Sequence, residues 1–422
     1  MQPLRIAIIG TGISGLGAAY LLHPQHSITV YEKNTVAGGH SRTVMVNTAT
    51  DGAVPVDTGF IVFNNRNYPL LSGLFKHLQV PVANSNMSFG ASINNGWLEY
   101  GTQRLGAIFA QKRNLVRPEF YRMVADVFRF HREARGWLDK DPDITLGDCL
   151  RALKMGDWFT HYFLLAMGGA IWSTPLPQML EFPARSFVRF FDNHGLLSLN
   201  DQPQWMTVVG GSREYVRRLS AGFADRIKLN CGAARVIRHA DQIEVQDTRG
   251  GSVMFDQVIF ACHADQALAM LANPSAAEQQ ILGAFRYQKN RAVLHSDTRF
   301  MPHHKKAWAS WVYLAEGRHD TNPAVSLSYW MNRLQPLPTK QPMIVTLNPA
   351  RPPEAALQHD ATEFEHPVFD AGAIRAQTQL PKIQGSDRIW YCGAYQRYGF
   401  HEDGFMSGVA VAQSLGAKIP WS

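Results

Sequence analysis

The chain has 422 residues, of which 45% are hydrophobic and 11% aromatic, and its formal net charge is +7 at pH 7. This composition is globular and excludes a low-complexity or repeat protein, and the length suggests two or three domains. The four cysteines lack metal-ligand spacing, no apolar run is long enough to span a membrane, and no nucleic-acid-binding module is recognisable. We therefore expect a cytoplasmic protein with reduced thiols.

The N-terminal elements predict a βαβ unit. Residues 5–10 are apolar and β-branched and end in glycine, so they are expected to form a buried strand. Residues 13–22 are small or helix-favouring, and residues 27–33 are predicted to form a second strand that carries Glu32 near its end.

The glycines of GTGISG (10–15) predict a dinucleotide site at the turn before the helix. Gly10 permits the tight turn, Gly12 lets a pyrophosphate approach the backbone, and Gly15 lets helix and strand pack closely. The helix N-terminus adds amide donors and a partial positive charge. Glu32 can accept hydrogen bonds from a ribose diol and would repel the 2′-phosphate of NADP. A turn that binds nothing is the alternative, but the order of elements favours a dinucleotide, and FAD in particular.

Residues 104–135 form a basic segment with an apolar stripe. Eight Lys or Arg residues stand there against three acidic residues. Apolar residues recur at helical spacing: Phe120, Met123, Val124, Val127 and Phe128. One interpretation is a helix that rests on anionic lipid at the inner face of the membrane, or a basic mouth for an acidic amphiphile. The other is a surface helix with a solvated basic face.

Later segments carry further nucleotide-binding signals. Residues 208–219 predict a glycine turn that enters a helix, and residues 235–250 and 253–262 predict strands. Residues 389–395 predict a strand that ends in glycine. Residues 404–415 predict a helix of small residues whose N-terminus can face an anionic or carbonyl group.

We therefore expect an α/β protein with a discontinuous, Rossmann-like FAD-binding domain made of residues 1–75, 205–270 and 385–422. Residues 76–204 and 271–384 would form a substrate-binding domain of the α+β type, because helical patterns and short strands both occur there. Ligands usually bind where such domains meet.

Together these segments resemble the FAD-dependent amine oxidase superfamily, which includes monoamine oxidases, protoporphyrinogen oxidases and phytoene desaturases. The resemblance covers nearly the full length, and within the superfamily it points to a bacterial group known only as predicted NAD/FAD-binding proteins. It is carried by GTGISGLGAAYLL (10–22), VYEKNTVAGGHSRT (30–43), VDTGFIVFN (56–64) and CGAYQRYGFHEDGFMSG (392–408). It implies a two-domain fold of the amine-oxidase type with bound FAD.

The family pattern implies a set of cofactor-binding residues. They are Gly10, Gly12, Ser14, Gly15, Glu32, Lys33, Gly38, Gly39, His40, Ser41, Gly59, Phe60, Val236, Gly393, Gly404, Phe405 and Met406. Gly59 and Phe60 would lie by the isoalloxazine, and Val236 would bond the adenine through its backbone. The turn at 404–406 would place amides at the pyrimidine carbonyl, where reduced flavin carries negative charge.

Three positions depart from the family pattern. His40 stands where many amine oxidases have arginine, and Ala394 stands where the C-terminal motif usually has an acid. No lysine is clearly assignable beside the reactive flavin nitrogen; Lys289 and Arg291 share a strand face, and either could lie near it. Amine oxidation is therefore not the reaction we expect.

His401 and Glu402 are the polar candidates for catalysis, because the resemblance places their turn against the isoalloxazine. The alternative is that they hold the loop through capping and turn hydrogen bonds. His194 could reach the cavity or be a buried structural histidine. Several aromatic residues could line an apolar tunnel or form ordinary core: Trp97, Tyr100, Trp172, Trp311, Tyr329, Trp330 and Tyr395. No metal site is predicted.

The predicted function is an FAD-dependent oxidoreductase. It would oxidise or desaturate a hydrophobic, lipid-like substrate by hydride transfer to the flavin. One alternative is a flavin-dependent isomerase without net redox change, and another is a flavin-free binding protein on the same scaffold. The expected partners are a hydrophobic small molecule or lipid and, through residues 104–135, a membrane surface, but not nucleic acid.

Overall fold

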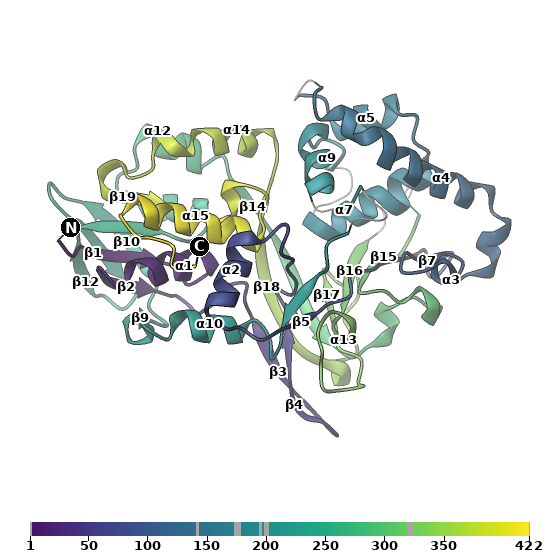
Figure 1. Ribbon diagram of the computed structural model, residues 1–422, viewed down its shortest axis with the longest axis horizontal. Helices are drawn as coiled ribbons and strands as arrows, with labels where there is room; N and C mark the ends of the chain where they lie inside the picture. The colour runs from purple at the N-terminus through teal and green to yellow at the C-terminus, as the bar shows by residue number, and fades with distance from the viewer. Residues whose placement is uncertain are drawn as a thin grey trace.

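The computed structural model describes residues 2–140, 143–172, 179–193, 196–197, 202–318 and 324–421. Two lobes lie side by side, and both chain ends lie in the same lobe (Figure 1). We call this lobe the first lobe and the other the second lobe.

A parallel five-stranded sheet forms the centre of the first lobe, in the order β19-β13-β1-β2-β9. Its strands are β1 (Arg5–Ile9), β2 (Ser27–Tyr31), β9 (Ile227–Lys228), β13 (Gln257–Phe260) and β19 (Ile389–Tyr391). Each neighbouring pair is parallel, so the carboxyl ends of the strands meet at one edge. Ligands bind at this edge in open parallel sheets. The predicted α/β class is confirmed.

Both faces of this sheet are covered, as a parallel sheet requires. Along β1, Ile6 and Ile8 point to one face and Ala7 and Ile9 to the other. The first face packs against α1 (Ile13–Leu22), α2 (Pro69–His77), α10 (Arg213–Ser220) and α15 (His401–Ser414). The second packs against the antiparallel sheet of β10 (Ala233–Arg238), β11 (Ile243–Asp247) and β12 (Ser252–Phe255), and against α11 (Ala264–Met270), α12 (Ala276–Leu282) and α14 (Ala371–Gln379).

Helices α1 and α15 approach closely because glycines leave room at their contact. A Cβ on Gly17 would lie 2.6 Å from the Phe405 ring, and a Cβ on Gly408 would lie 2.2 Å from the carbonyl oxygen of Ser14. This packing places the start of α15 beside the glycine turn that precedes α1.

A mainly antiparallel seven-stranded sheet forms the second lobe, in the order β18-β14-β17-β16-β15-β6-β7. Its strands are β6 (Phe89–Ile93), β7 (Leu98–Gly101), β14 (Arg286–His295), β15 (Trp311–Ala315), β16 (Val325–Trp330), β17 (Ile344–Leu347) and β18 (Gln358–Val368). Strands β14 and β18 are long and run from this sheet toward the first lobe (Figure 1). The helices of this lobe are α3 (Leu105–Ile108), α4 (Pro118–Glu133), α5 (Leu146–Ala152), α6 (Asp157–Phe159), α7 (Leu165–Trp172), α9 (Ala184–Asn193) and α13 (Met331–Leu334).

Two small strand pairs complete the fold. Strands β3 (Thr43–Thr48) and β4 (Gly52–Asp57) form a hairpin, and β5 (Val82–Asn84) pairs with β8 (Met206–Val208). Within the described ranges, no helix is both long and apolar enough to cross a membrane. The domain limits given by the sequence stay a prediction.

Candidate cofactor site and active site

A cavity of about 1900 Å³ is lined by residues of both lobes. Its wall includes the ends of β1 and β2, residues 39–44, part of β18, and side chains of α4 and α7. Pockets for drug-sized ligands usually measure about 300–1,000 Å³. This cavity therefore has room for a cofactor together with a second molecule.

The glycine turn after β1 leaves an open cradle in this wall. A Cβ on Gly12 would meet no atom within 4 Å. Its neighbours have no such room, because a Cβ on Gly10 would lie 2.5 Å from the carbonyl oxygen of Ala261 and one on Gly15 would lie 2.0 Å from that of Gly10. Chain packing thus requires glycine at 10 and 15, whereas Gly12 keeps space free for a ligand.

The N-terminus of α1 offers donors at this cradle. Gly12 is the N-cap, no side chain caps the helix, and the first turn has no acidic residue. The first amides therefore lack acceptors within the helix, and the helix dipole adds positive charge. Gly39 passes close by, since its Cβ would lie 3.0 Å from the Cα of Gly12. A pyrophosphate would fit here, because the turn has room for it, free amides can donate to it, and the positive end of the helix dipole attracts it.

Glu32 fits the ribose end of a dinucleotide. It follows β2, lines the cavity and is 5% exposed. Its Oε2 accepts hydrogen bonds from the amide (3.1 Å) and the hydroxyl of Thr11, and its Oε1 accepts one from the amide of Asn34 (2.8 Å). A carboxylate has about four acceptor positions, so capacity remains for a ribose hydroxyl.

Most of the predicted cofactor-binding residues line the cavity. They are Gly10, Gly12, Ser14, Glu32, Lys33, Gly39, His40, Ser41, Gly59, Phe60, Gly393 and Gly404. Gly15, Gly38, Val236, Phe405 and Met406 lie outside the described wall. Gly38 holds the glycine turn in place, because its amide donates a hydrogen bond to the carbonyl oxygen of Thr11 (3.1 Å). Contact of each lining residue with FAD stays a prediction.

Val236 does not line the described wall, so its predicted backbone bonds to adenine stay a prediction. Its carbonyl accepts a hydrogen bond from the amide of Ala272 (2.9 Å), and the side chain is 1% exposed within the core. Gly232 and Ala233, where β10 begins, line the cavity instead. The structure divides the predicted strand run 235–250 into β10 and β11, and the strand pattern does not tell which residues line the cavity.

Helix α15 begins at His401, three residues before the predicted start at 404. The Gly404 amide consequently donates to the carbonyl oxygen of Phe400 (3.1 Å). The amides of Phe405 and Met406 belong to the helix rather than to a turn, so they are not available for the predicted contact with the flavin. The amides without intrahelical acceptors are those of the first three residues of α15.

Glu402 faces away from the cavity, which corrects its prediction as a catalytic residue. Its Oε1 and Oε2 accept hydrogen bonds from the amides of Leu70 (2.8 Å) and Leu71 (3.0 Å) in the first turn of α2. Burial raises the pKa of this carboxyl to about 7. Glu402 therefore caps α2, in line with the structural alternative.

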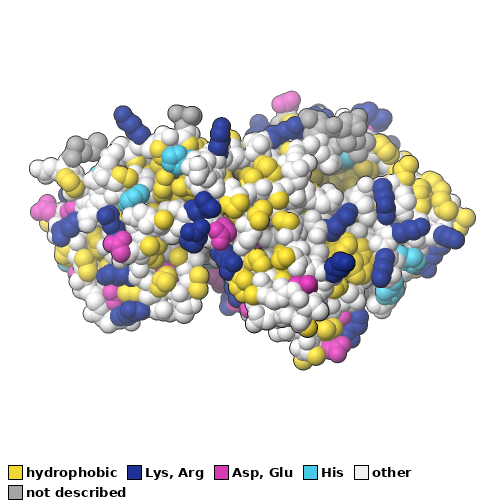
Figure 2. Space-filling view, turned by 60° about the horizontal axis from the view of Figure 1, so that its bottom comes forward, with side chains coloured by type: hydrophobic (Ala, Val, Ile, Leu, Met, Phe, Trp, Pro, Cys, Tyr) yellow, Lys and Arg dark blue, Asp and Glu magenta, His cyan; other side chains and the backbone are white. Residues whose placement is uncertain are grey.

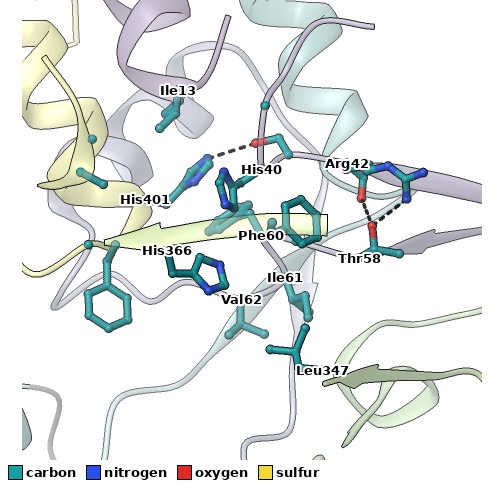
Figure 3. A pocket seen from close by; sticks show the side chains of 18 of the residues that line it. Ile13, His40, Arg42, Thr58, Phe60, Ile61, Val62, Leu347, His366 and His401 are labelled. Carbon is teal, nitrogen blue, oxygen red and sulfur yellow. Dashed lines mark hydrogen bonds between the residues drawn. The ribbon is translucent and has the colours of Figure 1, made fainter. Parts of the chain in front are cut away.

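His401 does lie on the cavity wall, where its ring stacks on Phe60 with centroids 3.9 Å apart (Figure 3). Its Nε2 lies 2.6 Å from the Tyr215 hydroxyl and 3.2 Å from the Ser41 hydroxyl, and these hydroxyls also bond each other. Burial lowers the pKa of His401 to about 3 and raises that of Tyr215. The group is therefore neutral at pH 7 and can orient a ligand without adding charge.

Three cavity histidines were missed by the sequence reasoning, namely His131 in α4, His263 and His366. His263 follows β13 and stacks on Tyr287, with ring centroids 4.2 Å apart. His366 lies in β18, with its ring centroid 5.4 Å from that of His40. Burial lowers the pKa of His40, His263 and His366. Its position directly after a predicted strand could have indicated His263, whereas His366 had no local signal.

The two basic candidates for the position beside the flavin nitrogen lie outside the cavity wall. Lys289 is exposed and its Nζ pairs with Oε1 of Glu363 (3.1 Å), and Arg291 is also exposed. Asn290, between them, is buried. Lys33 is the only lysine among the described residues of the wall.

The part of the cavity that residues 86–205 and 311–347 of the second lobe line is mostly apolar, whereas Glu363 and Glu365, which also line the cavity, lie on β18. Its lining includes Met87, Phe89, Tyr100, Ile108, Phe120, Met123, Val124, Val127, Phe128, Phe163, Met167, Phe190, Trp311, Tyr329 and Leu347. No Asp, Glu, Lys or Arg is among the described lining residues that this lobe contributes between positions 86–205 and 311–347. We call this part the apolar chamber.

The predicted aromatic candidates divide between cavity and core. Tyr100, Trp311, Tyr329 and Tyr395 line the cavity. Trp97 instead packs under the guanidinium of Arg117, 4.9 Å from its ring centroid, and Trp330 packs against Trp308. The side chain of Trp172 and the whole of His194 lie outside the described residues.

The apolar stripe of α4 faces the chamber. Phe120 and Met123 are buried, and Val124 and Val127 line the wall beside them. Phe128 lines the cavity and is also 55% exposed, so it marks an opening. The stripe therefore forms part of the cavity wall, and membrane contact through residues 104–135 stays a prediction.

The chain matches one family profile, and its fold is similar to that of several solved structures. The profile of the flavin-containing amine oxidoreductases matches residues 13–345. A CLA-producing fatty acid isomerase from P. acnes has a similar structure, with a TM-score of 0.70 at 13% identity, covering 99% of this chain and 100% of that one. Cyclohexylamine oxidase from Brevibacterium oxydans IH-35A gives 0.68 at 14%, covering 98% and 99%, and reduced UDP-galactopyranose mutase gives 0.66 at 16%, covering 98% and 95%. No curated protein matches the sequence.

Proposed function

The chain belongs to the family of flavin-containing amine oxidoreductases, and from this premise we propose that it is an FAD-dependent enzyme that oxidises or desaturates the apolar part of a hydrophobic, lipid-like substrate. The observation that carries the proposal is the two-part cavity, in which a dinucleotide cradle opens into the apolar chamber. An ion without a partner is costly to bury. The absence of charged side chains from the described chamber wall therefore favours an acyl chain or a similar apolar substrate over a diamine.

FAD fits the first part of the cavity. Gly12 and the N-terminus of α1 would hold its pyrophosphate, Glu32 would hold its ribose, and Gly59 and Phe60 would lie beside its ring. When bound, FAD supplies two-electron chemistry by accepting a hydride or its equivalent. The chain positions the cofactor and excludes water from the reacting atoms, since the apolar chamber begins next to Phe60, at Ile61 and Val62 (Figure 3).

The outer surface of α3 and α4 is the part of the chain that we propose contacts a membrane. It exposes Leu105, Leu115, Val116, Tyr121 and Phe128. Exposed basic residues surround them: Arg104, Lys112, Arg122, Lys305 and Lys306. Hydrophobic side chains stand among Lys and Arg at this end of the molecule (Figure 2). Such a surface suits anionic lipid, and Phe128 connects it with the chamber.

Anaerobic incubation with a fatty-acid probe tests the proposed reaction. The flavin that is released from the purified protein is first identified by mass spectrometry, and the holoprotein is then mixed with oleate or linoleate without an electron acceptor. An oxidoreductase bleaches its flavin once and stops. Bleaching by a diamine such as putrescine, with no response to apolar compounds, would overturn the substrate proposal.

The second candidate function is a flavin-dependent isomerase. The similarity in fold to a fatty acid isomerase and to UDP-galactopyranose mutase keeps this candidate open. In the same experiment an isomerase would rearrange the fatty acid through many turnovers while the flavin stays oxidised. A protein that is colourless and does not take up added FAD would instead be a binding protein.

A further inference from the structure

His366 carries its proton on Nε2, and the surrounding hydrogen bonds fix this assignment. Its Nδ1 lies 3.0 Å from the Nδ2 of Asn290. That nitrogen also donates to the carbonyl oxygen of Gln288 (3.2 Å), which can only accept. The atom that meets His366 must therefore be the amide nitrogen of Asn290, so Nδ1 of His366 is the acceptor.

A second asparagine fixes the same orientation from the other end. The backbone amide of Arg291 donates to Oδ1 of Asn348 (2.9 Å), so the remaining side-chain group of Asn348 is its NH₂. This group donates to Oδ1 of Asn290 (2.7 Å). Asn348, Asn290 and His366 thus form a hydrogen-bond relay. Both of its ends assign the Nδ2 of Asn290 as the donor to His366. Asn290 is 0% exposed, so water does not compete for these bonds.

The relay also keeps His366 neutral. A proton on Nδ1 would face the NH₂ of Asn290, which places two donors against each other. Burial and the nearby His263 lower the pKa of His366 to about 4. The imidazole is therefore a neutral N–H donor at pH 7, with its lone pair turned away from the cavity and into the relay.

The free N–H group meets the cavity at the junction of its two parts. His366 lines the wall together with His40 and Phe60 (Figure 3), and no described residue accepts a hydrogen bond from its Nε2. The ring of His40 is held by stacking on Phe364, with centroids 4.9 Å apart.

We propose that His366 is an orienting residue that donates one neutral hydrogen bond from Nε2 to an unprotonated oxygen or nitrogen of the molecule bound at this junction. The proposal rests on the proposed function, because that molecule is either the flavin ring or a carbonyl or carboxylate group of the substrate. A fixed neutral donor aligns its acceptor without adding positive charge, and the bond strengthens when the acceptor gains negative charge.

Histidine-selective ¹⁵N NMR of the flavin-loaded protein tests the tautomer directly. The His366→Phe variant identifies the signal. We expect an unprotonated Nδ1 and a protonated Nε2 at pH 7, and the reverse pattern in Asn290→Asp, where the new carboxylate can only accept. A protonated Nδ1 in the wild-type protein would overturn the proposal. This measurement needs no turnover, so it gives an answer even if the proposed reaction is wrong.

The bound acceptor is identified by comparing His366→Phe with His366→Gln, which keeps a donor. A lower flavin reduction potential in the phenylalanine variant, without substrate, would place the bond on the cofactor. An unchanged potential with about five- to tenfold weaker oleate binding, the loss expected for one hydrogen bond, would place it on the substrate. Glutamine should restore part of either effect. If neither quantity changes, the proposal fails. His239→Phe, at an exposed histidine of the first lobe, is the matched control.

Discussion

Gly12 shows at a single residue how the fold reserves space for a cofactor. Its φ of −62° is open to any residue, and a Cβ there would touch nothing. Neither the backbone nor the packing of the free chain therefore requires glycine at this position. What requires it is the ligand, whose pyrophosphate must come within contact distance of the backbone.

We expect Gly12→Val to give a folded protein that has lost FAD. The valine side chain would fill the cradle at the N-terminus of α1, whereas the fold has room for it. Flavin content by absorbance and folding by circular dichroism measure the two effects separately. Gly106→Val is the control, because a Cβ on Gly106 also meets nothing within 4 Å but lies away from the glycine turn. A soluble Gly12→Val protein with full flavin content would show that the cradle binds something else.

At the scale of elements, the contact of α15 with α2 shows that a motif can locate a cavity segment correctly and still not predict what each of its residues does. The GFHEDGF sequence is adjacent to the cavity, and two neighbouring residues in it were candidates for catalysis. Because α15 begins at His401, successive side chains point in different directions around the helix. His401 faces Phe60, while Glu402 faces the N-terminus of α2.

Glu402 should make the protein less stable as the pH rises. Its pKa is about 7 in the folded protein, raised by burial, against 4.5 for the free group. The folded state therefore holds an extra proton between these values, so the free energy of unfolding falls as the pH increases from about 4.5 to 7, by up to about 3 kcal/mol.

The test compares the thermal midpoints at pH 5 and pH 8 in the wild type and in Glu402→Gln. The variant should lose part of this pH dependence, because glutamine does not titrate. It should also be slightly destabilised at pH 5, since one α2 amide loses its acceptor. Glu363→Gln, at an exposed ion pair with Lys289, serves as the control. Equal slopes for all three proteins would contradict the assignment of Glu402.

At the scale of the whole molecule, the sequence predicts elements whose residues are close together in the chain. It does not predict contacts that form only when two distant strands pair. The βαβ unit is predicted because its strands, helix and glycines follow one another within the first 32 residues. His366 is missed because its role depends on the pairing of β14 with β18, which brings Asn290 within reach of it. Helical periodicity likewise indicates the apolar face of α4, but it does not tell that a cavity lies against that face.

The surface around α3 cannot be predicted from periodicity either, because periodicity does not tell what covers its apolar residues. Leu105 is 77% exposed and Val116 is 80% exposed, and neither lines the described cavity wall. Two apolar side chains held in water next to Arg104 and Lys112 would gain free energy in the interface of an anionic bilayer. The opening at Phe128 would then face the bilayer, where an apolar substrate is most concentrated.

We therefore expect the protein to sediment with vesicles that contain phosphatidylglycerol, and to do so less at high salt, since the electrostatic part of the attraction is screened. Leu105→Ser combined with Val116→Ser should weaken this binding by about tenfold or more, because each change removes an apolar side chain that the lipid would bury. Val253→Ser, at a partly exposed residue of the first lobe, should bind like the wild type. Flavin content should stay equal in all three proteins, because none of these residues lines the cavity. Equal vesicle binding by the wild type and the double variant would mean that the bilayer meets another face, and the chamber would then have to be filled from water.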